Sequence, residues 1–350
     1  MEDDEFMKAA VMTEQREIKI MDVPEPVMDP TDVKVKIAYC GICGSELHAF
    51  DPAFAAGGTK PQQKPSLPRP GQRIMGHEAS GTIVAIGKEC KQGYKIGQKV
   101  AMNFRSPCGA CYYCRNGKEH FCDLVTPASG GYAEYAVYRE NDIYLLPDNV
   151  SLEEGALLEP VSVAVHTIDL SNIKPGNSVA ILGGGPIGLL VLEMAIRAGA
   201  ARTLLSEPSE GRRQFAKKIG ADVVVNPITE NLLEVGKKLT DGRGFDTVIE
   251  AVGKIALAEQ AMEMADYGGT VVWAAMYPQG AKAGVAPAYM YNHELTIRSV
   301  FISPYSFPRS MNLLPKLNLK PWISVLPLDK INEGFQTLIQ GKAIKILIKP

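Results

Sequence analysis

The 350-residue sequence lacks three features, and each absence narrows the range of functions. Its formal net charge is only −2, so no broad electrostatic attraction for nucleic acid or anionic lipid is expected. No segment approaches the roughly 20 consecutive apolar residues of a membrane helix. The N-terminus is acidic, with the sequence MEDDEFMKAAV, and it has no apolar core of a secretory signal. We therefore expect a cytoplasmic protein whose partners are neither nucleic acids nor membranes.

Cysteine occurs seven times, and this odd number without an export signal favours thiolate ligands over disulfides. Four of these residues follow the spacing C-x2-C-x2-C-x7-C: Cys108, Cys111, Cys114 and Cys122. Four thiolates so close in sequence suit a tetrahedral zinc ion with no open position, which is a structural site. An iron–sulfur cluster is the competing interpretation. The bacterial cluster run, however, has its last cysteine after three residues and before a proline, whereas here seven residues precede it and an aspartate follows.

Short runs that alternate apolar and polar residues dominate the first 150 residues. This alternation, interrupted by Gly, Pro and Asn, is typical of half-buried strands. It predicts strands at 32–40, 81–87, 97–102 and 132–138. The segment 57–73 is too rich in Pro, Gly and charge for regular structure, and it is expected to form a surface loop.

From about residue 155, β-branched runs alternate with helical ones, which is typical of βαβ units in a doubly wound parallel sheet. The pattern predicts helices at 186–200, 209–221, 229–242 and 256–269, with strands between them. A final strand, KILIKP at 345–350, indicates that the chain returns to its first domain. We expect one domain of residues 1–155 and 300–350, with a zinc lobe at about 105–123, and a second of residues 156–299.

A glycine motif follows the first strand of the second domain. Gly183, Gly185 and Gly188 stand in a G-x-G-x-x-G frame between this strand and a helix. The first glycine permits a tight turn, the second lets the backbone approach a pyrophosphate, and the third allows close helix packing. The helix N-terminus favours the phosphates. We assign dinucleotide binding to these glycines and to Pro186 and Ile187 among them.

The residue at the end of the next strand bears on the choice of cofactor. Glu207 lies 19 residues after Gly188, where a carboxylate accepts hydrogen bonds from the ribose hydroxyls and repels a 2′-phosphate. NAD is therefore expected rather than NADP. Arg212 and Arg213 leave NADP open, because either guanidinium is near enough in sequence to reach the adenine or a 2′-phosphate. We include Arg212 and Val252 among the cofactor-binding residues.

Candidate ligands for a second metal occur in three separated segments. Cys43 and His48 lie in CGICGSELH, His77 and Glu78 lie in GHEASG, and Glu159 lies in LLEPVS. A catalytic zinc needs fewer protein ligands than a structural one, because one position stays open for water or substrate. Each segment alone is commonly structural. Beside a four-cysteine lobe and a dinucleotide motif, their combination predicts a catalytic metal.

At this point the chain resembles a known family over essentially its whole length. The family is that of the zinc-dependent medium-chain dehydrogenases/reductases, or zinc-containing alcohol dehydrogenases, in the branch of sorbitol/polyol, butanediol and threonine dehydrogenases. The motifs that carry this resemblance are CGICGSELH, GHEASGTIVAIG, the four-cysteine lobe, GGYAEYAV, LLEPVSVAVH, GGGPIGLL and SEPSEGRRQFAKKIGA. The resemblance implies an α/β protein with a GroES-like β-rich catalytic domain and a Rossmann nucleotide-binding domain.

The resemblance also implies roles for single residues. Cys43 is expected to supply the thiolate ligand of the catalytic zinc and His77 the imidazole ligand. The remaining protein ligand is either Glu78 or Glu159, with a water completing the tetrahedron. Glu46 stands behind the metal, where much of the family has Asp, and the longer side chain can alter how the ligands are oriented.

Ser45 and His48 match the family's relay positions, which pass the substrate proton by way of the nicotinamide ribose to solvent. The expected reaction is hydride transfer between a secondary alcohol of a polyol, diol or hydroxy amino acid and NAD(P), giving the ketone. The resemblance implies two zinc ions per chain and a homo-oligomer, either a dimer or a tetramer. The physiological substrate and the stereochemistry stay open.

Three alternatives belong to other classes of protein. One is a zinc-free reductase of enones or quinones from the same superfamily, and another is a non-catalytic member of the fold. The third is a nucleic-acid-binding zinc ribbon. This last module would need a basic surface, whereas only Arg115 and Lys118 lie between the outer cysteines of the lobe.

Overall fold

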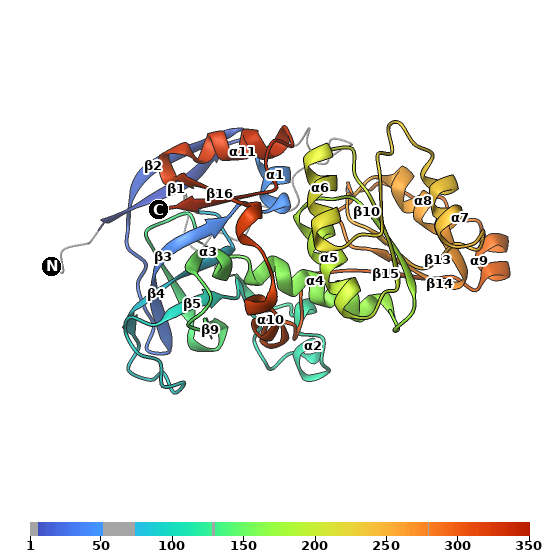
Figure 1. Ribbon diagram of the computed structural model, residues 1–350. Coiled ribbons are helices and arrows are strands. Elements are labelled where there is room, and N and C mark those ends of the chain that lie inside the picture. The colour runs from blue at the N-terminus through green and yellow to red at the C-terminus, as the bar shows by residue number, and fades with distance from the viewer. Residues whose placement is uncertain (1–5, 52–73, 128–129, 279) are drawn as a thin grey trace. The chain divides into compact units, whose positions relative to one another are not determined.

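The computed structural model describes residues 6–51, 74–127, 130–278 and 280–350, so the loop expected at 57–73 lies outside the described residues. The described chain divides into two compact units (Figure 1). The first unit holds the described residues up to Glu159 and those from Pro304 to the end, and the second holds those from Pro160 to Ser303. The described chain therefore leaves the first unit and returns to it.

A mostly antiparallel sheet forms the centre of the first unit. Within the described residues its strands follow the order β16-β17-β3-β4-β5-β9, and β8 pairs with β3 outside this path. These strands are β3 (Asp32–Gly41), β4 (Glu78–Ile86), β5 (Lys99–Met102), β8 (Tyr135–Arg139), β9 (Ile143–Leu145), β16 (Ile323–Pro327) and β17 (Lys345–Lys349). In β3 the side chains of Val33, Val35 and Ile37 are buried and that of Lys36 is exposed, as the period of two predicts.

The first unit has further strands and helices outside this sheet. Two strands, β1 (Phe6–Glu14) and β2 (Glu17–Pro24), form an antiparallel pair, and so do β6 (Arg105–Ser106) and β7 (Thr126–Pro127). The helices of the unit are α1 (Gly44–Phe50), α2 (Tyr112–Arg115), α3 (Leu152–Gly155), α10 (Phe307–Leu313) and α11 (Ile331–Ile339). Most of them are short, so tertiary packing rather than helix propensity stabilises them.

The last 50 residues complete the core of the first unit. The closing strand β17 pairs antiparallel with β3, placing Ile348 opposite Cys40 and Leu347 opposite Gly41. Helix α11 contributes Phe335, whose ring centroid lies 4.8 Å from that of Phe50 in α1. The predicted return of the chain to its first domain is therefore seen as a shared sheet and a shared core.

The second unit is built on a parallel sheet of six strands within the described residues, in the order β12-β11-β10-β13-β14-β15. The strands are β10 (Ser178–Leu182), β11 (Arg202–Ser206), β12 (Val223–Val225), β13 (Phe245–Glu250), β14 (Ala265–Trp273) and β15 (Thr296–Ser299). All five residues of β10 are buried, which is typical of a parallel strand covered on both faces.

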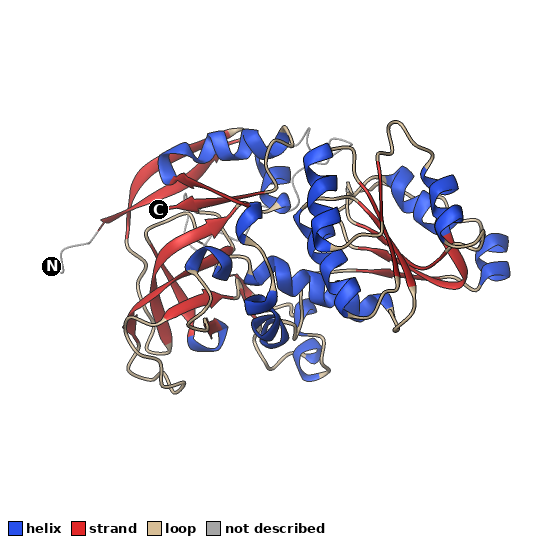
Figure 2. Ribbon diagram, in the orientation of Figure 1, coloured by secondary structure: helices blue, strands red, loops and turns tan. Residues whose placement is uncertain are grey.

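Helices cover both faces of this sheet (Figure 2). They are α4 (Leu158–Ser171), α5 (Pro186–Arg197), α6 (Glu210–Ile219), α7 (Leu232–Leu239), α8 (Ile255–Met264) and α9 (Pro287–His293). In Figure 1, α5 and α6 lie on one side of the strands and α7 and α8 on the other. The chain runs from β10 outward to β12 and then starts again beside β10 with β13, so the topological switch point lies between β10 and β13.

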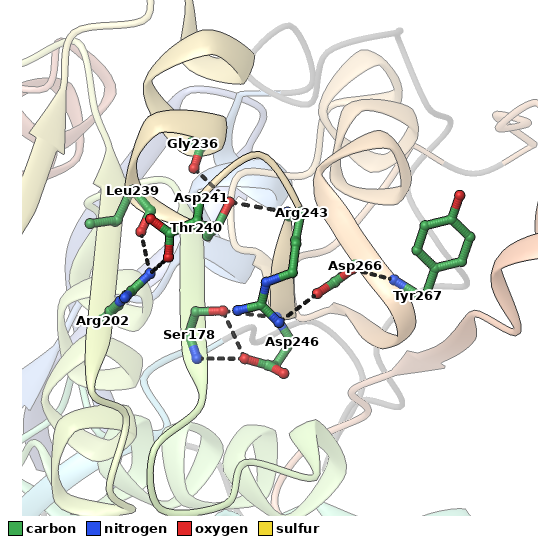
Figure 3. Close-up of polar contacts among 11 residues, drawn as sticks. Ser178, Arg202, Gly236, Leu239, Thr240, Asp241, Arg243, Asp246, Asp266 and Tyr267 are labelled. Carbon is green, nitrogen blue, oxygen red and sulfur yellow. Dashed lines mark hydrogen bonds and ion pairs between the residues drawn. The ribbon is translucent and has the colours of Figure 1, made fainter.

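Hydrogen bonds and ion pairs link residues at the edge of the sheet where the parallel strands begin (Figure 3). The backbone N–H of Ser178, the first residue of β10, donates to Asp246 Oδ2 at 2.8 Å. Arg202, the first residue of β11, donates to Asp241 Oδ2, also at 2.8 Å. Hydrogen-bond donors and acceptors at this amino-terminal edge of the sheet are therefore paired with one another. The opposite edge, which carries the glycine turn, is where open α/β sheets bind their ligands.

One predicted helix is wrong in its last five residues. The helix expected at 256–269 ends at Met264, and strand β14 begins at Ala265, whose backbone is extended (φ −76°, ψ 141°). Ala265 and Asp266 are both buried, as Met262 and Met264 of α8 are, so burial alone does not mark the boundary. The pairing of Ala265 with Phe245 in β13, which no local pattern reports, decides the boundary.

Candidate metal centres and cofactor site

Antiparallel pairing of β3 and β4 brings two of the predicted ligand segments together. Gly41, near the end of β3, pairs with Glu78, the first residue of β4. Cys43 follows β3 and is the N-cap of α1, and His77 directly precedes β4. The ligand atoms of Cys43, His77 and Glu78 lie within 4.8 Å of one another. A thiolate, an imidazole and a carboxylate at this separation suit zinc with one position left open.

The carboxylate of Glu46 forms hydrogen bonds with the backbone of both ligand segments. Its Oε2 accepts the backbone N–H of Cys43 at 3.0 Å, and its Oε1 accepts that of Gly76 at 2.7 Å. The buried hydroxyl of Tyr132 also donates to Oε2. Oε1 lies 3.4 Å from His77 Nδ1, which leaves the Nε2 atom of this imidazole for a metal.

The pKa values of His77 and Glu46 depend on each other's charge and on the surrounding groups. Burial alone lowers the pKa of His77, but the charges of Cys43 and Glu46 outweigh it and hold this pKa well above its usual range. Burial raises the pKa of Glu46, whereas His77 and the Tyr132 hydroxyl lower it by more, so its net pKa is below normal. Glu46 is therefore an acceptor held ready to orient the imidazole.

Glu78 has a cationic partner that the sequence did not predict. Lys345 and Glu78 are 2% and 1% exposed and form an ion pair, and Lys345 Nζ also donates to Ile42 O at 2.9 Å. Burial lowers the pKa of Lys345, but the charges of Glu78 and Cys43 raise this pKa by more. The net pKa is above normal, so the lysine is charged. The only sequence signal for it is a lysine among the apolar residues of the strand KILIKP.

Glu159, the second residue of α4, is not part of the close group of three. It is buried, and burial raises its pKa to about 7, with the charge of His77 acting against this rise. A carboxyl group with this pKa is half protonated near neutral pH. Glu159 differs from Glu78 in lying outside that group of ligand atoms.

The four cysteines of the lobe lie together around α2. The Sγ atoms of Cys108, Cys111, Cys114 and Cys122 lie within 4.8 Å of one another. Backbone N–H groups of Ala110 and Cys111 donate to Cys108 Sγ at 3.4 and 3.3 Å, and they lower the pKa of Cys108 to about 6. Sulfur atoms that accept backbone N–H groups are stabilised as thiolates, which is the form that binds zinc.

Ser45 and His48 both lie on α1, three residues apart and therefore on one face of the helix. Both side chains are partly exposed. Burial lowers the pKa of His48, so its imidazole is neutral at pH 7 and able to accept a proton. The two remaining cysteines, Cys40 and Cys90, stand outside both groups of possible ligands.

The glycine turn has the geometry that its sequence predicts. Gly183 has a φ of +112°, which favours glycine, and α5 starts at Pro186 after Gly185 as the N-cap. A Cβ on Gly188 would overlap Gly183 O, so the helix packs on the turn only without a side chain there. A Cβ on Gly185 would have no neighbour within 4 Å, and that side of the turn is open.

Glu207 follows β11 and lies against this turn. Its Oε2 accepts the Gly184 N–H at 2.8 Å and its Oε1 accepts the Ser209 N–H at 2.9 Å. Arg212 Nη1 lies 4.0 Å from Oε2. Arg213 points to the main chain instead, donating to Glu207 O and Pro208 O, and it pairs with the side chain of Glu210.

Comparisons with known proteins agree with this geometry. Residues 29–148 match the alcohol dehydrogenase GroES-like domain, and residues 186–316 match the zinc-binding dehydrogenase family. Sorbitol dehydrogenase of Bacillus subtilis (strain 168) is 32% identical over 354 residues, covering 98% of this chain and 97% of the relative. The chain belongs to the zinc-dependent medium-chain dehydrogenase family.

Other similar proteins lie in the same family. L-threonine 3-dehydrogenase of Pyrococcus horikoshii is 33% identical, with 95% of this chain and 94% of the relative covered. A zinc-binding dehydrogenase from Sinorhizobium meliloti 1021, solved with bound NADP, has a TM-score of 0.89 at 30% identity and covers 99% of this chain and 100% of its own.

Membership of the family confirms several predictions. The α/β fold with a GroES-like domain and a Rossmann domain is confirmed, as are oxidoreductase activity and the cofactors zinc and NAD(P). The comparisons give no support to a zinc-free reductase or a non-catalytic member. Within the described residues, no helix is both long and apolar enough to cross a membrane.

Proposed function

We propose that this dehydrogenase oxidises a secondary alcohol of a polyol, diol or hydroxy amino acid to the ketone with NAD, and catalyses the reverse reduction. The observation that carries the proposal is the close group of Cys43, His77 and Glu78. The relatives named sorbitol dehydrogenase and L-threonine 3-dehydrogenase support the substrate class.

The proposed catalytic zinc is held by Cys43, His77 and Glu78, and a structural zinc is held by Cys108, Cys111, Cys114 and Cys122. Glu159 is the alternative to Glu78. The distances favour Glu78, because its carboxylate oxygen lies within 4.8 Å of the other two ligand atoms.

When bound, zinc supplies Lewis acidity that makes an alcohol hydroxyl easier to deprotonate, and NAD(P) accepts the hydride. The chain's own residues supply orientation and a path for the proton. Glu46 fixes the direction of the His77 imidazole and ties the backbone of Cys43 to that of Gly76. Ser45 and His48, on one face of α1, are proposed to pass the substrate proton toward solvent, and the low pKa of His48 leaves a neutral acceptor.

NAD is the proposed physiological cofactor. Glu207 is held beside the glycine turn by two backbone N–H groups, so its carboxylate cannot easily move away from a 2′-phosphate. Arg213 is engaged with main-chain oxygens and Glu210, which leaves Arg212 as the residue for the adenine side. The proposed contacts to the cofactor also include the turn residues Pro186 and Ile187, and Val252.

The domain division and the assembly are also proposals. We propose a catalytic domain of residues 1–155 and 300–350 and a nucleotide-binding domain of residues 156–299; the compact units, which change at 159/160 and 303/304, support this division. A cytoplasmic homo-oligomer, dimer or tetramer, is proposed from the family resemblance. Light scattering after size-exclusion chromatography measures the assembly directly.

Elemental analysis of zinc tests the proposed ligands. The parent protein is expected to contain about two zinc ions per chain and Cys43→Ala about one, because only the four-cysteine lobe stays intact. Cys40→Ala is the matched control from the same stretch and should keep both ions. Glu78→Gln and Glu159→Gln then compare the two carboxylates, and a larger loss of zinc in Glu159→Gln would reverse the assignment of the third ligand.

A substrate panel tests the reaction. We expect NAD-linked oxidation of polyols, diols or 3-hydroxy amino acids by the parent and none by Cys43→Ala. Equal zinc content in the parent, Cys43→Ala and Cys40→Ala would refute the catalytic centre. Faster turnover with NADP than with NAD would refute only the cofactor choice.

A further inference from the structure

Glu250 lies at the topological switch point of the second unit. It is the last residue of β13, which pairs with β10 on the side away from β11. Gly183 follows β10, and the turn Ala251–Gly253 follows β13. Open α/β sheets bind ligands in the crevice outside the carboxyl ends of the two strands at this point. The two turns therefore border the same part of the dinucleotide site.

The turn after β13 packs directly on the glycine turn. The backbone N–H of Ala251 donates to Leu182 O at 2.9 Å. A Cβ on Gly183 would lie 2.5 Å from Val252 Cγ2 and 3.2 Å from Ala251 O. The Ala251–Gly253 turn therefore lies directly beside the backbone that approaches the cofactor.

The carboxylate of Glu250 accepts hydrogen bonds from the backbone of this turn. Glu250 is 0% exposed, and its Oε1 accepts the N–H groups of Val252 and Gly253, each at 2.9 Å. Its Oε2 accepts the Gly253 N–H at 3.1 Å and the hydroxyl of Tyr277. Burial raises the pKa of Glu250, and these donors act against the rise.

Tyr277 extends the contact to the segment after β14. The ring of Tyr277 lies 6.0 Å from that of Trp273, edge to face, and Trp273 ends the strand. A Cβ on Gly253 would overlap Met276 O, so the segment that carries Tyr277 lies against the Ala251–Gly253 turn. One buried carboxylate thus links the chain segments after two neighbouring strands.

The side of the sheet on which these segments lie identifies the part of the cofactor. Glu207, the proposed ribose partner, follows β11 on one side of β10, so the adenosine half lies on that side. The nicotinamide half must then lie over β13 and β14. Val252, in the turn after β13, is apolar, yet 42% of its surface is exposed.

We propose that Glu250 and Tyr277 form a clamp that positions the nicotinamide half of the cofactor by fixing the Ala251–Gly253 turn. Both are positioning residues and neither touches the reacting atoms. This inference rests on the proposed binding of NAD at the glycine turn. Since the clamp lies on one side of the switch point, it affects the nicotinamide half and not the adenosine half.

Binding of NADH and of AMP separates the two halves. Both ligands are titrated calorimetrically into the holoenzyme, into Tyr277→Phe and into Glu250→Gln. We expect the Kd of NADH to rise about tenfold in Tyr277→Phe, because the turn loses part of the support that orders it for binding, and at least as much in Glu250→Gln. The Kd of AMP should stay within about twofold, since AMP contacts only the adenosine side.

The control variant is Tyr289→Phe, which removes another partly buried hydroxyl of the same unit, one that donates to Met262 O at 3.4 Å. It should bind both ligands as the parent does. Unchanged NADH binding in Tyr277→Phe overturns the clamp, and so does an equal loss of NADH and AMP affinity, which indicates a merely structural role. A parent that binds neither NADH nor NADPH refutes the proposed cofactor site itself.

Discussion

The first unit buries an ion pair beside its proposed metal ligands. Lys345 and Glu78 pair out of contact with water, and Lys345 also faces Cys43 and Glu159. A buried pair stabilises the fold only while both partners stay, because a lone buried charge is costly. Zinc bound at the proposed site would be a second source of positive charge for Glu78, beside Lys345.

Lys345→Met is expected to destabilise the zinc-free protein by about 3–5 kcal/mol, the usual cost of removing one partner of a buried ion pair. The loss should be smaller in the zinc-loaded protein, where the metal compensates the charge of Glu78. Urea unfolding with and without a chelator measures both values. Lys349→Met, an exposed lysine of the same strand, is the control. An equal loss with and without zinc would contradict the shared role.

Asp142 is another buried carboxyl group, and its raised pKa predicts a pH dependence of stability. Burial raises its pKa from 3.8 to about 6, although a hydrogen bond with Ser106 opposes this. Between these two values the unfolded chain has released the proton while the folded chain keeps it. Stability should therefore fall as the pH rises from about 4 to about 6.

Asp142→Asn removes this contribution and should raise the free energy of unfolding at pH 7 by up to about 2–3 kcal/mol. At pH 4 the parent and the variant should be nearly equal. Chemical denaturation at a series of pH values checks the difference, and parallel curves for the two proteins would refute it.

Among the elements, the β10–turn–α5 segment shows how a glycine position is fixed. Gly188 lies in the first turn of α5, and a Cβ added to it would overlap Gly183 O, which leaves no room for a side chain. Gly211, in the first turn of α6, has no heavy atom within 4 Å of the position of an added Cβ. A side chain therefore fits at Gly211 but not at Gly188, although both glycines lie in the first turn of a helix.

Gly188→Ala is expected to cost at least about 1–3 kcal/mol of stability because its methyl group overlaps backbone that cannot move freely. Gly211→Ala should instead stabilise by about 0.5–1 kcal/mol, the difference in helix propensity. Thermal or urea unfolding of the two variants gives the comparison directly. Equal effects of both substitutions would show that the turn adapts to a side chain.

Over the whole molecule, the proposed metals and the proposed cofactor belong to different units. Both groups of possible zinc ligands lie in the first unit, whereas the glycine turn and Glu207 lie in the second. Removing zinc and adding cofactor should therefore change the stability of different parts of the chain, since a ligand stabilises the structure that it contacts.

Hydrogen exchange followed by mass spectrometry tests this expectation. A chelator should increase exchange most at residues 105–123 and around 41–48 and 76–80, because these segments lose their ligand. NADH should protect residues 182–188 and 250–253. Protection by NADH confined to the first unit would contradict the proposed site.

The sequence by itself determined the fold class, the family and most of the candidate site. Strong local signals carried these predictions, namely the alternation in β3, the glycine frame after β10 and the cysteine spacing of the lobe. It also nominated Cys43, His77 and Glu78, but it left Glu159 equal to Glu78, because spacing along a chain contains no distances.

Only the tertiary structure decided the rest. Long-range pairing of β17 with β3 brings Lys345 to Glu78, and the pairing of Ala265 with Phe245 ends α8 five residues before the predicted end. Tyr277 reaches Glu250 because the chain segments after β13 and β14 meet at one edge of the sheet. These contacts join residues far apart in sequence, and burial makes them strong, so no local pattern of the sequence could report them.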